Sequence, residues 1–384
     1  MAHPFPVNLM INTVRGPLPL TLERSPIPLP QGPGETSPPL HYGPYLSSVA
    51  SCLAQDDHGP LREALSAHLQ RSVALKDIRA VEIISEKHGA CYHVLQVRTT
   101  LPEGVCSLAV DVAVTGYQKS AMEREFQTVK ELHGRFHRPF LPRFYLMGEA
   151  RYRFGEEDPM PLGVLVAEWF EDYHEFHLSG PQEGRVPRIK LWESDEEGDF
   201  LDEAETRSLY HQASFILTAY FDGNSFRQIH PWHHAAGDFV VHRDAAGIRM
   251  RLITARDYRC LCASAFDSED RWVPILHFLF NLSVRMRLDR LDGRGPLAWA
   301  PPDSLSGVLS GFLEAWREKT STNSILPAAE DVLEVTRQLN REDWISFGEC
   351  VIDDCMVESD ENTFIRERLH EHVVSLTEAI RKAI

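Results

Sequence analysis

The sequence has little positive charge and none of the apolar runs that cross membranes. Its 39 Lys and Arg residues are outnumbered by 56 Asp and Glu residues, giving a formal net charge of -17. Because phosphate recognition needs clustered Lys and Arg, this balance disfavours nucleic-acid and anionic-membrane surfaces. The first residues also lack the basic and apolar pattern of a secretory signal. We therefore expect a cytoplasmic protein that has no nucleic-acid or membrane partner.

Several short motifs with well-understood chemistry are missing as well. The seven cysteines form no CxxC pair, so the sequence indicates neither a thioredoxin-type site nor a zinc knuckle, and scattered thiols fit a reducing compartment. The GxGxxG, GxxxxGK[ST] and GxSxG patterns are also absent. Dinucleotide-binding, P-loop and α/β-hydrolase sites are therefore not indicated.

Proline is concentrated at the beginning of the chain. Eleven of the 25 prolines lie in residues 1–45. Proline lacks a backbone N–H and interrupts helices, so we expect this segment to be an extended arm or loop.

The next part of the sequence predicts a small sheet flanked by helices. The expected elements are helical segments in 46–72, two strands in 81–100, a strand at 106–114, a helix at 120–136 and strands within 140–154 and 161–170. The two strands of 81–100 would meet at a turn at His88–Gly89. In the helix at 120–136, Met122, Phe126, Val129 and Leu132 share one face, and Gly134 stands where a C-cap is expected.

The second half of the sequence is mostly helical. An acidic stretch at 193–205 predicts a solvated loop, and its last acids favour the start of an apolar helix at 202–222. A strand hairpin follows at 239–255, and the residues after about 270 have helical periodicity. We expect an α+β protein with three parts. They are an arm at 1–45, a sheet lobe with preceding helices at 46–170, and a helical lobe at 171–384 that contains a loop-like segment at 229–258.

Three segments in the first of these lobes resemble the protein-kinase-like fold, and most closely its aminoglycoside and choline phosphotransferase branch. ISEKHGACYHVLQV, with Lys87 and Gly89, is similar to the hairpin that covers phosphates in that family. EREFQTVKEL is similar to the helix whose glutamate holds a phosphate-binding lysine, with Glu125 or Glu123 in that place. VLVAEWFEDY is similar to the hinge strand that meets an adenine ring, with Glu168 and Trp169 at its end.

The resemblance extends over residues 80–290 and includes a catalytic-loop-like stretch, HPWHHAAGDFVVHRDAAG. It implies a two-lobed fold, with ATP and Mg²⁺ as cofactors. It places His233 at the catalytic aspartate and Asp238 at a metal-binding asparagine. The second metal position falls on Thr254 by strict spacing, or on Asp257 if a short insertion is allowed, and only Asp257 could help to hold Mg²⁺.

The sequence also departs from the family. The strand LAVDVAV has no lysine, and Asp111 or Ala113 stands where the phosphate-binding cation is expected. An acid there repels phosphate, and Lys87 and Lys119 are the nearby cations that could compensate. We therefore expect a degenerate, pseudokinase-type protein with a ligand-binding or regulatory role. Its partner would be a small molecule or nucleotide in a cleft between the lobes, or another protein.

Two alternatives remain open from the sequence. One is an active, ATP-dependent small-molecule phosphotransferase that uses His233 as a base and Asp238 with Asp257 on Mg²⁺. The other is a metal-dependent enzyme built on His230, His233 and His234, since imidazole is a common ligand of Zn²⁺ and Fe²⁺. His174 and His177 could add ligands to such a site, although the helical HxxxH spacing is absent.

Overall fold

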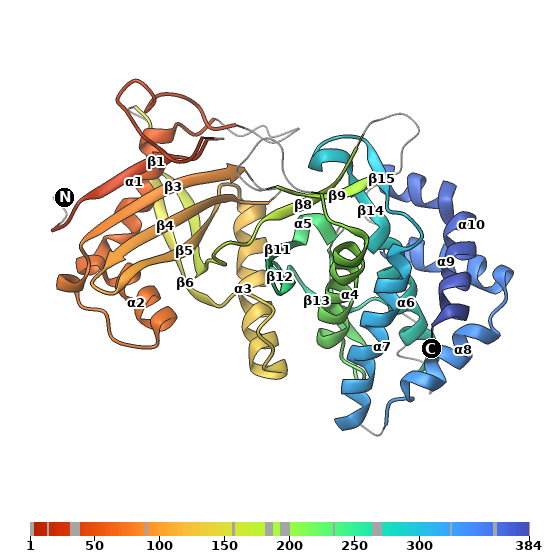
Figure 1. Ribbon diagram of the computed structural model, residues 1–384. Coiled ribbons are helices and arrows are strands. Elements are labelled where there is room, and N and C mark those ends of the chain that lie inside the picture. Colours follow the sequence, from red (N-terminus) through yellow and green to blue (C-terminus); the bar gives the residue numbers. More distant parts are fainter. Residues whose placement is uncertain are drawn as a thin grey trace. The chain divides into compact units, whose positions relative to one another are not determined.

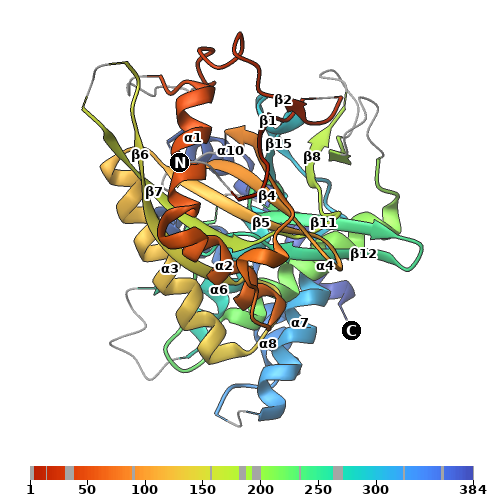
Figure 2. The ribbon, with the colours of Figure 1, turned by 90° about the vertical axis from the view of Figure 1, so that its left-hand side faces the viewer.

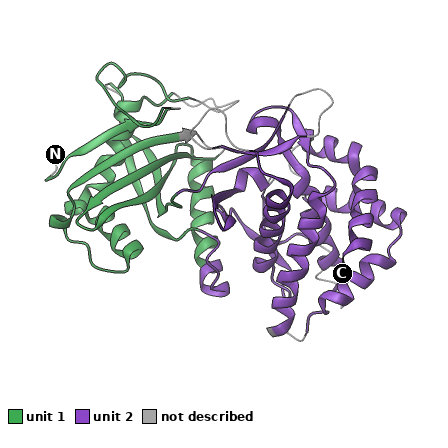
Figure 3. Cartoon of the chain, viewed as in Figure 1, with its two compact units in different colours: residues 1–130, 142–171 green, residues 131–141, 172–384 purple. Residues whose placement is uncertain are grey.

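The structure is a computed structural model of the 384-residue chain. It describes residues 4–13, 15–30, 39–88, 91–155, 158–180, 187–192, 200–232, 235–262, 271–322, 325–355 and 359–383. These residues form two compact units, which Figure 3 colours separately. Unit 1 comprises residues 1–130 and 142–171, and unit 2 comprises residues 131–141 and 172–384. Figure 1 labels the helices and strands.

Unit 1 is built on a mixed sheet that has seven strands among the described residues. Their order is β2-β1-β3-β4-β5-β7-β6. The strands are β1 (Val7–Ile11), β2 (Leu18–Pro19), β3 (Ala80–His88), β4 (His93–Leu101), β5 (Gly104–Ala113), β6 (Phe144–Tyr152) and β7 (Met160–Glu168). All neighbours pair antiparallel except β1 and β3, which are parallel. The strands expected in 81–100, 106–114, 140–154 and 161–170 are therefore confirmed.

The two faces of this sheet are covered by different helices. On one face, α1 (Tyr42–Leu53) and α2 (Gln55–Leu69) contribute to the main core and contact β6, as Figure 2 shows. On the other face, Met122 of α3 (Gly116–Phe136) packs with Ala113 and Leu165, and Phe126 lies against the same cluster. The amphipathic helix expected at 120–136 is thus confirmed.

Two expectations about unit 1 are wrong in detail. The helix α3 continues through Gly134 to Phe136, so Gly134 is not a C-cap. A glycine inside a helix is tolerated, and the sequence does not distinguish it from one that follows a helix end. The proline-rich segment is also more than an arm or loop, because it supplies β1 and β2. The stretch VNLMI contains no proline and can therefore pair with β3 along its whole length.

Unit 2 consists mainly of helices. They are α4 (Glu203–Tyr220), α5 (Ala235–Asp238), α6 (Trp272–Arg287), α7 (Ser304–Thr322), α8 (Ala329–Gln338), α9 (Arg341–Cys355) and α10 (Ser359–Lys382). The acids expected to favour the start of α4 form a capping box there, since Asp202 accepts a hydrogen bond from the Glu205 N–H and the Glu205 side chain accepts one from the Asp202 N–H. Both bonds fix the start of α4.

Four two-stranded sheets accompany these helices in the described part of unit 2. The pairs are β8 (Glu175–Ser179) with β9 (Arg188–Trp192), β10 (Arg227–Ile229) with β13 (Tyr258–Cys260), β11 (Phe239–Asp244) with β12 (Gly247–Leu252), and β14 (Leu288–Arg290) with β15 (Leu297–Trp299). The hairpin predicted at 239–255 is β11–β12. Sequence periodicity did not reveal the shorter pairs.

Two further findings bear on the expectations from composition. Among the described residues, no helix combines the length and the apolar character needed to span a membrane. The seven cysteines are all free thiols.

Candidate functional site

The catalytic-loop-like stretch of unit 2 lies against the segment that follows the β11–β12 hairpin. The His230 N–H donates to the Asp257 carbonyl at 3.0 Å, and the Ile253 N–H donates to the Asp238 carbonyl at 2.9 Å. Backbone hydrogen bonds therefore bring together the two segments in which the sequence places the metal-binding candidates. His230 and Asp238 are both buried, at 1% relative exposure each.

Asp238 forms an ion pair that the sequence did not predict. An Arg256 Nη1 lies 2.8 Å from Asp238 Oδ1, and the same nitrogen donates to the Pro231 carbonyl at 3.2 Å. A buried carboxylate needs a partner of opposite charge, because burial penalises an isolated ion severely. Arg256 therefore neutralises Asp238 and also holds the start of the loop.

Asp257 has a different environment. Its side chain is 42% exposed, its Oδ1 accepts a hydrogen bond from the Tyr258 N–H at 2.7 Å, and its Oδ2 lies 3.8 Å from Arg259 Nε. Thr254 is half-buried in the same segment. A shared Mg²⁺ between Asp238 and Asp257 remains a prediction, as does the choice between Thr254 and Asp257.

A second arginine also donates hydrogen bonds to the backbone of this loop. Arg285 of α6 is 2% exposed and donates to the carbonyls of Trp232, at 2.7 Å, and Cys355, at 2.6 Å. Its Nε donates to Asn281 Oδ1 at 3.1 Å. Because Arg285 and Arg256 bind neighbouring carbonyls of the same loop, the backbone at 231–232 is fixed on two sides.

The histidine cluster is only partly within the described residues. His233 and His234 lie outside them, so the base assigned to His233 and the metal site assigned to the cluster stay predictions. The backbones of His174 and Val241 form two hydrogen bonds with each other, and His177 Nδ1 lies 3.2 Å from Asp289 Oδ1. The described residues contain no group of three or more His, Cys, Asp or Glu side chains that could hold a metal ion.

In unit 1, the lysine-free strand β5 places Asp111 on the face that α3 covers. Residues alternate along a strand, and Ala113, two positions on, packs with Met122 of α3. Val110 and Val112 point instead into the core shared with α1 and α2. Asp111 and Ala113 are the two positions at which the resemblance expects a cation. Both therefore lie on the face of β5 that α3 covers.

Glu125 of α3 is the buried member of the two glutamates considered. It is 3% exposed, whereas Glu123 is exposed. The Tyr92 hydroxyl donates to Glu125 Oε2 at 3.1 Å. Burial, followed by the charges of Glu125 and Asp111, raises the pKa of Tyr92 far above its usual value, so the hydroxyl keeps its proton. Tyr92 lies in the hairpin sequence, but nothing in that sequence predicted its contact with Glu125 of α3.

The other predicted ligand-binding residues of unit 1 occupy separate positions. Gly89 lies outside the described residues, and the backbone of Lys87 pairs with Val94 next to a β-bulge. Lys119 donates to the Pro161 carbonyl. Glu168 accepts a hydrogen bond from the Arg143 N–H at 3.1 Å, and Trp169, just after β7, is half-buried. None of these contacts assigns a ligand to them.

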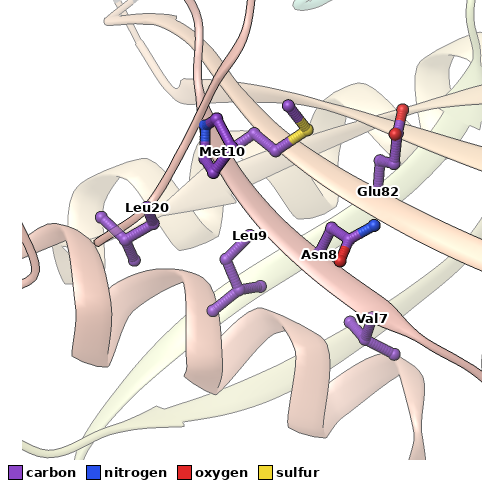
Figure 4. Close-up of a pocket in the computed structure, with 7 residues that line it drawn as sticks. Val7, Asn8, Leu9, Met10, Leu20 and Glu82 are labelled. Carbon is purple, nitrogen blue, oxygen red and sulfur yellow. The ribbon is translucent and has the colours of Figure 1, made fainter. Parts of the chain in front are cut away.

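An open pocket of ≈ 520 Å³ lies at the β1–β2 edge of unit 1, as Figure 4 shows. It is lined by Val7, Asn8, Leu9, Met10, Pro19, Leu20 and Glu82. Most of these side chains are apolar. The polar ones are the Asn8 amide and the Glu82 carboxylate, which pairs with Arg98 at 3.5 Å. Such a lining does not suit a polyphosphate, because it presents a negative charge and no cation.

Comparison with known proteins assigns no family to the chain. No protein-family model matches the sequence, and a search of curated proteins finds no match.

Proposed function

We propose that this chain is a kinase-like protein that has lost phosphoryl transfer and acts as a ligand-binding or regulatory protein. The order of elements in unit 1 supports this proposal. Three strands (β3, β4 and β5), the helix α3 and two more strands (β6 and β7) follow one another, as the resemblance requires. The β11–β12 hairpin follows the loop that contains Asp238, again in the order of the family.

The observation that carries the proposal is that Asp111 lies on the face of β5 that α3 covers. In the related family, a glutamate on this helix holds a lysine that neutralises phosphate oxygens. Here Glu125 accepts a hydrogen bond from the neutral hydroxyl of Tyr92, and Asp111 replaces the cation on β5. A carboxylate at the position of that cation repels a polyphosphate, whereas phosphoryl transfer depends on positioning and charge neutralisation. This arrangement therefore opposes ATP binding.

The ion pair of Asp238 supports the same conclusion in unit 2. A divalent cation needs carboxylate oxygens that can turn toward it. Asp238 is 1% exposed and lies 2.8 Å from the Arg256 guanidinium, whose positive charge repels a metal ion. The residues present therefore do not fit Mg²⁺ at Asp238 unless Arg256 moves away.

Thermal unfolding and a transfer assay together test the proposal. The melting temperature of the full chain would be measured with ATP, GTP, Mg²⁺, Mn²⁺ and Zn²⁺, alone and combined, since a ligand that binds the native state raises it. Transfer of labelled phosphate from ATP to small alcohols and aminoglycosides would be measured in parallel. We expect no stabilisation by nucleotide with metal, and no transfer above the no-protein control.

Two outcomes would replace the proposal with a different function. Transfer that disappears in both His233→Ala and Asp238→Ala would establish the active phosphotransferase. Stabilisation by Zn²⁺ alone that disappears in His230→Ala would favour the metal-dependent enzyme.

A further inference from the structure

Helices α4 and α7 of unit 2 approach each other closely at two glycines. A Cβ atom on Gly311 would lie 2.0 Å from the His211 carbonyl oxygen, and one on Gly307 would lie 2.6 Å from the Arg207 carbonyl oxygen. No real side chain tolerates such distances, so glycine is required at both positions. Figure 1 shows the two helices side by side, in agreement with their many contacts. This approach places His211 of α4 against α7.

His211 connects a serine and a glutamate of α7. Ser310 Oγ lies 2.8 Å from His211 Nδ1, and Glu314 Oε2 lies 3.2 Å from His211 Nε2. Ser310 and Glu314 are four residues apart in the helix and so lie on the same face. The carboxylate favours a proton on Nε2, which leaves the lone pair of neutral imidazole on Nδ1, facing the hydroxyl.

A hydroxyl, a histidine base and an orienting acid within hydrogen-bond reach are the parts of an activated nucleophile. Reagents can reach this one, because Ser310 is exposed and the His211 and Glu314 side chains are 29% and 58% exposed. Ser310 Oγ also lies 2.9 Å from the Gly307 carbonyl, which competes with His211 for the hydroxyl proton.

We propose that Ser310 is a nucleophile that His211 activates toward activated acyl donors, namely esters with a good leaving group. Ser310 Oγ attacks the carbonyl carbon while its proton passes to His211 Nδ1. The bond to the leaving group breaks, and the leaving oxygen takes the proton from His211. The products are an acylated Ser310 and the free alcohol or phenol. Glu314 acts as a positioning residue for the imidazole.

The product is expected to accumulate. Enzymes that turn over acyl groups rapidly rely on preorganised donors for the developing oxyanion, and this is usually their largest contribution. The backbone N–H groups around Ser310 belong to the middle of α7 and are used in its helical hydrogen bonds. We therefore infer a stable acyl-serine rather than rapid hydrolysis.

The same helix supplies matched internal controls. Ser306 Oγ donates to the Asp303 carbonyl and Ser321 Oγ donates to the Glu318 carbonyl, both at 2.7 Å. Both serines are exposed and bond the carbonyl three residues back, as Ser310 does. Within the described residues, neither has a histidine hydrogen-bond partner. Differences in labelling among the three serines therefore report on His211.

The test is acetylation of the full chain by 4-nitrophenyl acetate, followed by peptide mass spectrometry. We expect Ser310 to be labelled at least about tenfold faster than Ser306 or Ser321, a threshold set below the roughly 10²–10⁴-fold effect of a positioned base. His211→Gln should reduce Ser310 to the rate of the controls. Glu314→Ala should lower its rate and Glu314→Asp should restore part of it, with unchanged thermal unfolding.

Equal labelling of the three serines in the wild-type chain would overturn the proposal, and so would an unchanged Ser310 rate in His211→Gln. The comparison within the wild-type chain needs no variant, so it stands even if a substitution disturbs folding. Because the site uses α4 and α7 and none of the kinase-like residues, its outcome is independent of the proposed function.

Discussion

Each compact unit contains a buried carboxylate at a position that matters for the kinase resemblance, and their partners differ. Asp238 in unit 2 is paired with the guanidinium of Arg256 at 2.8 Å. Glu125 in unit 1 accepts a hydrogen bond from the hydroxyl of Tyr92 at 3.1 Å. The first partner brings a full opposite charge and the second brings none. Removing each of these two partners should therefore have effects of different size on stability.

The largest expected effect is on the charged pair. Arg256→Met leaves the carboxylate of Asp238 buried without its guanidinium, and breaking such a pair costs about 3–5 kcal/mol. Equilibrium urea unfolding would measure the loss, and Arg256→Met combined with Asp238→Asn should recover part of it. Arg249→Met is the control, because Arg249 is 61% exposed in its pair with Asp244 and should change stability little. A loss in Arg256→Met no greater than in the control would show that Arg256 does not stabilise Asp238.

A smaller effect is expected for the hydrogen bond between Tyr92 and Glu125. Tyr92→Phe removes the donor to buried Glu125 and should cost about 1–3 kcal/mol in the free energy of unfolding. A double-mutant cycle with Glu125→Gln should give a coupling of about 0.5–3 kcal/mol, because the two side chains touch. Tyr117→Phe is the control, since Tyr117 is on α3, the helix of Glu125, and is 79% exposed. Zero coupling would mean that the hydrogen bond between Tyr92 and Glu125 does not contribute to the free energy of unfolding.

Lys319 of α7 is a half-buried base whose pKa is shifted. It donates to the Ala219 carbonyl at 2.7 Å, and burial, with Arg138 nearby, lowers its pKa from 10.5 to about 7. Between these two values the unfolded chain binds more protons than the folded chain, so stability rises with pH across this window. The slope from this group is at most about 1.4 kcal/mol per pH unit. Below pH 7, Lys319 is protonated in both the folded and the unfolded chain, so it no longer makes stability depend on pH.

Lys319→Met should therefore remove that slope and stabilise the protein most near pH 7, as judged by urea unfolding between pH 7 and 10. Lys130→Met, at an exposed position of α3, should keep the wild-type slope. Identical slopes in wild type and Lys319→Met would contradict the burial of an uncharged lysine.

The smallest effect concerns the helix that carries Glu125. Gly134→Ala should stabilise the protein by about 0.5–1 kcal/mol, since Gly134 lies inside α3 and an added Cβ meets nothing within 4 Å. Thermal unfolding would measure the gain. Destabilisation would instead indicate that Gly134 is the C-cap predicted from the sequence, because alanine is unfavourable where the backbone is left-handed.

The sequence predicted local elements better than the contacts between them. Periodicity over 81–170 located five strands and a helix because each pattern repeats within a few residues. The ends were less certain, as Gly134 shows. Short strands such as β1 were hidden by surrounding prolines, since composition averages over a longer stretch than five residues.

The partners in the candidate site were beyond the reach of sequence reasoning. The resemblance pointed to Asp238, and to Asp257 if a short insertion is allowed, but no motif marked Arg256, which lies between them in the sequence. A buried acid implies a cation, yet burial is known only once the chain is folded. The same limitation applies to Tyr92, which meets Glu125 across 33 residues, and to His211, which meets Ser310 across 99.

Titration calorimetry with Mg²⁺ and ATP tests the central claim most directly, using wild type and Asp111→Lys. The new ammonium would lie on the face of β5 that α3 covers and could neutralise phosphate oxygens, as the strand lysine does in the family that the sequence resembles. We predict no measurable binding to wild type and measurable binding to Asp111→Lys. Tight binding to wild type that is lost in Asp111→Lys would show that the acid serves a nucleotide, and would contradict the account.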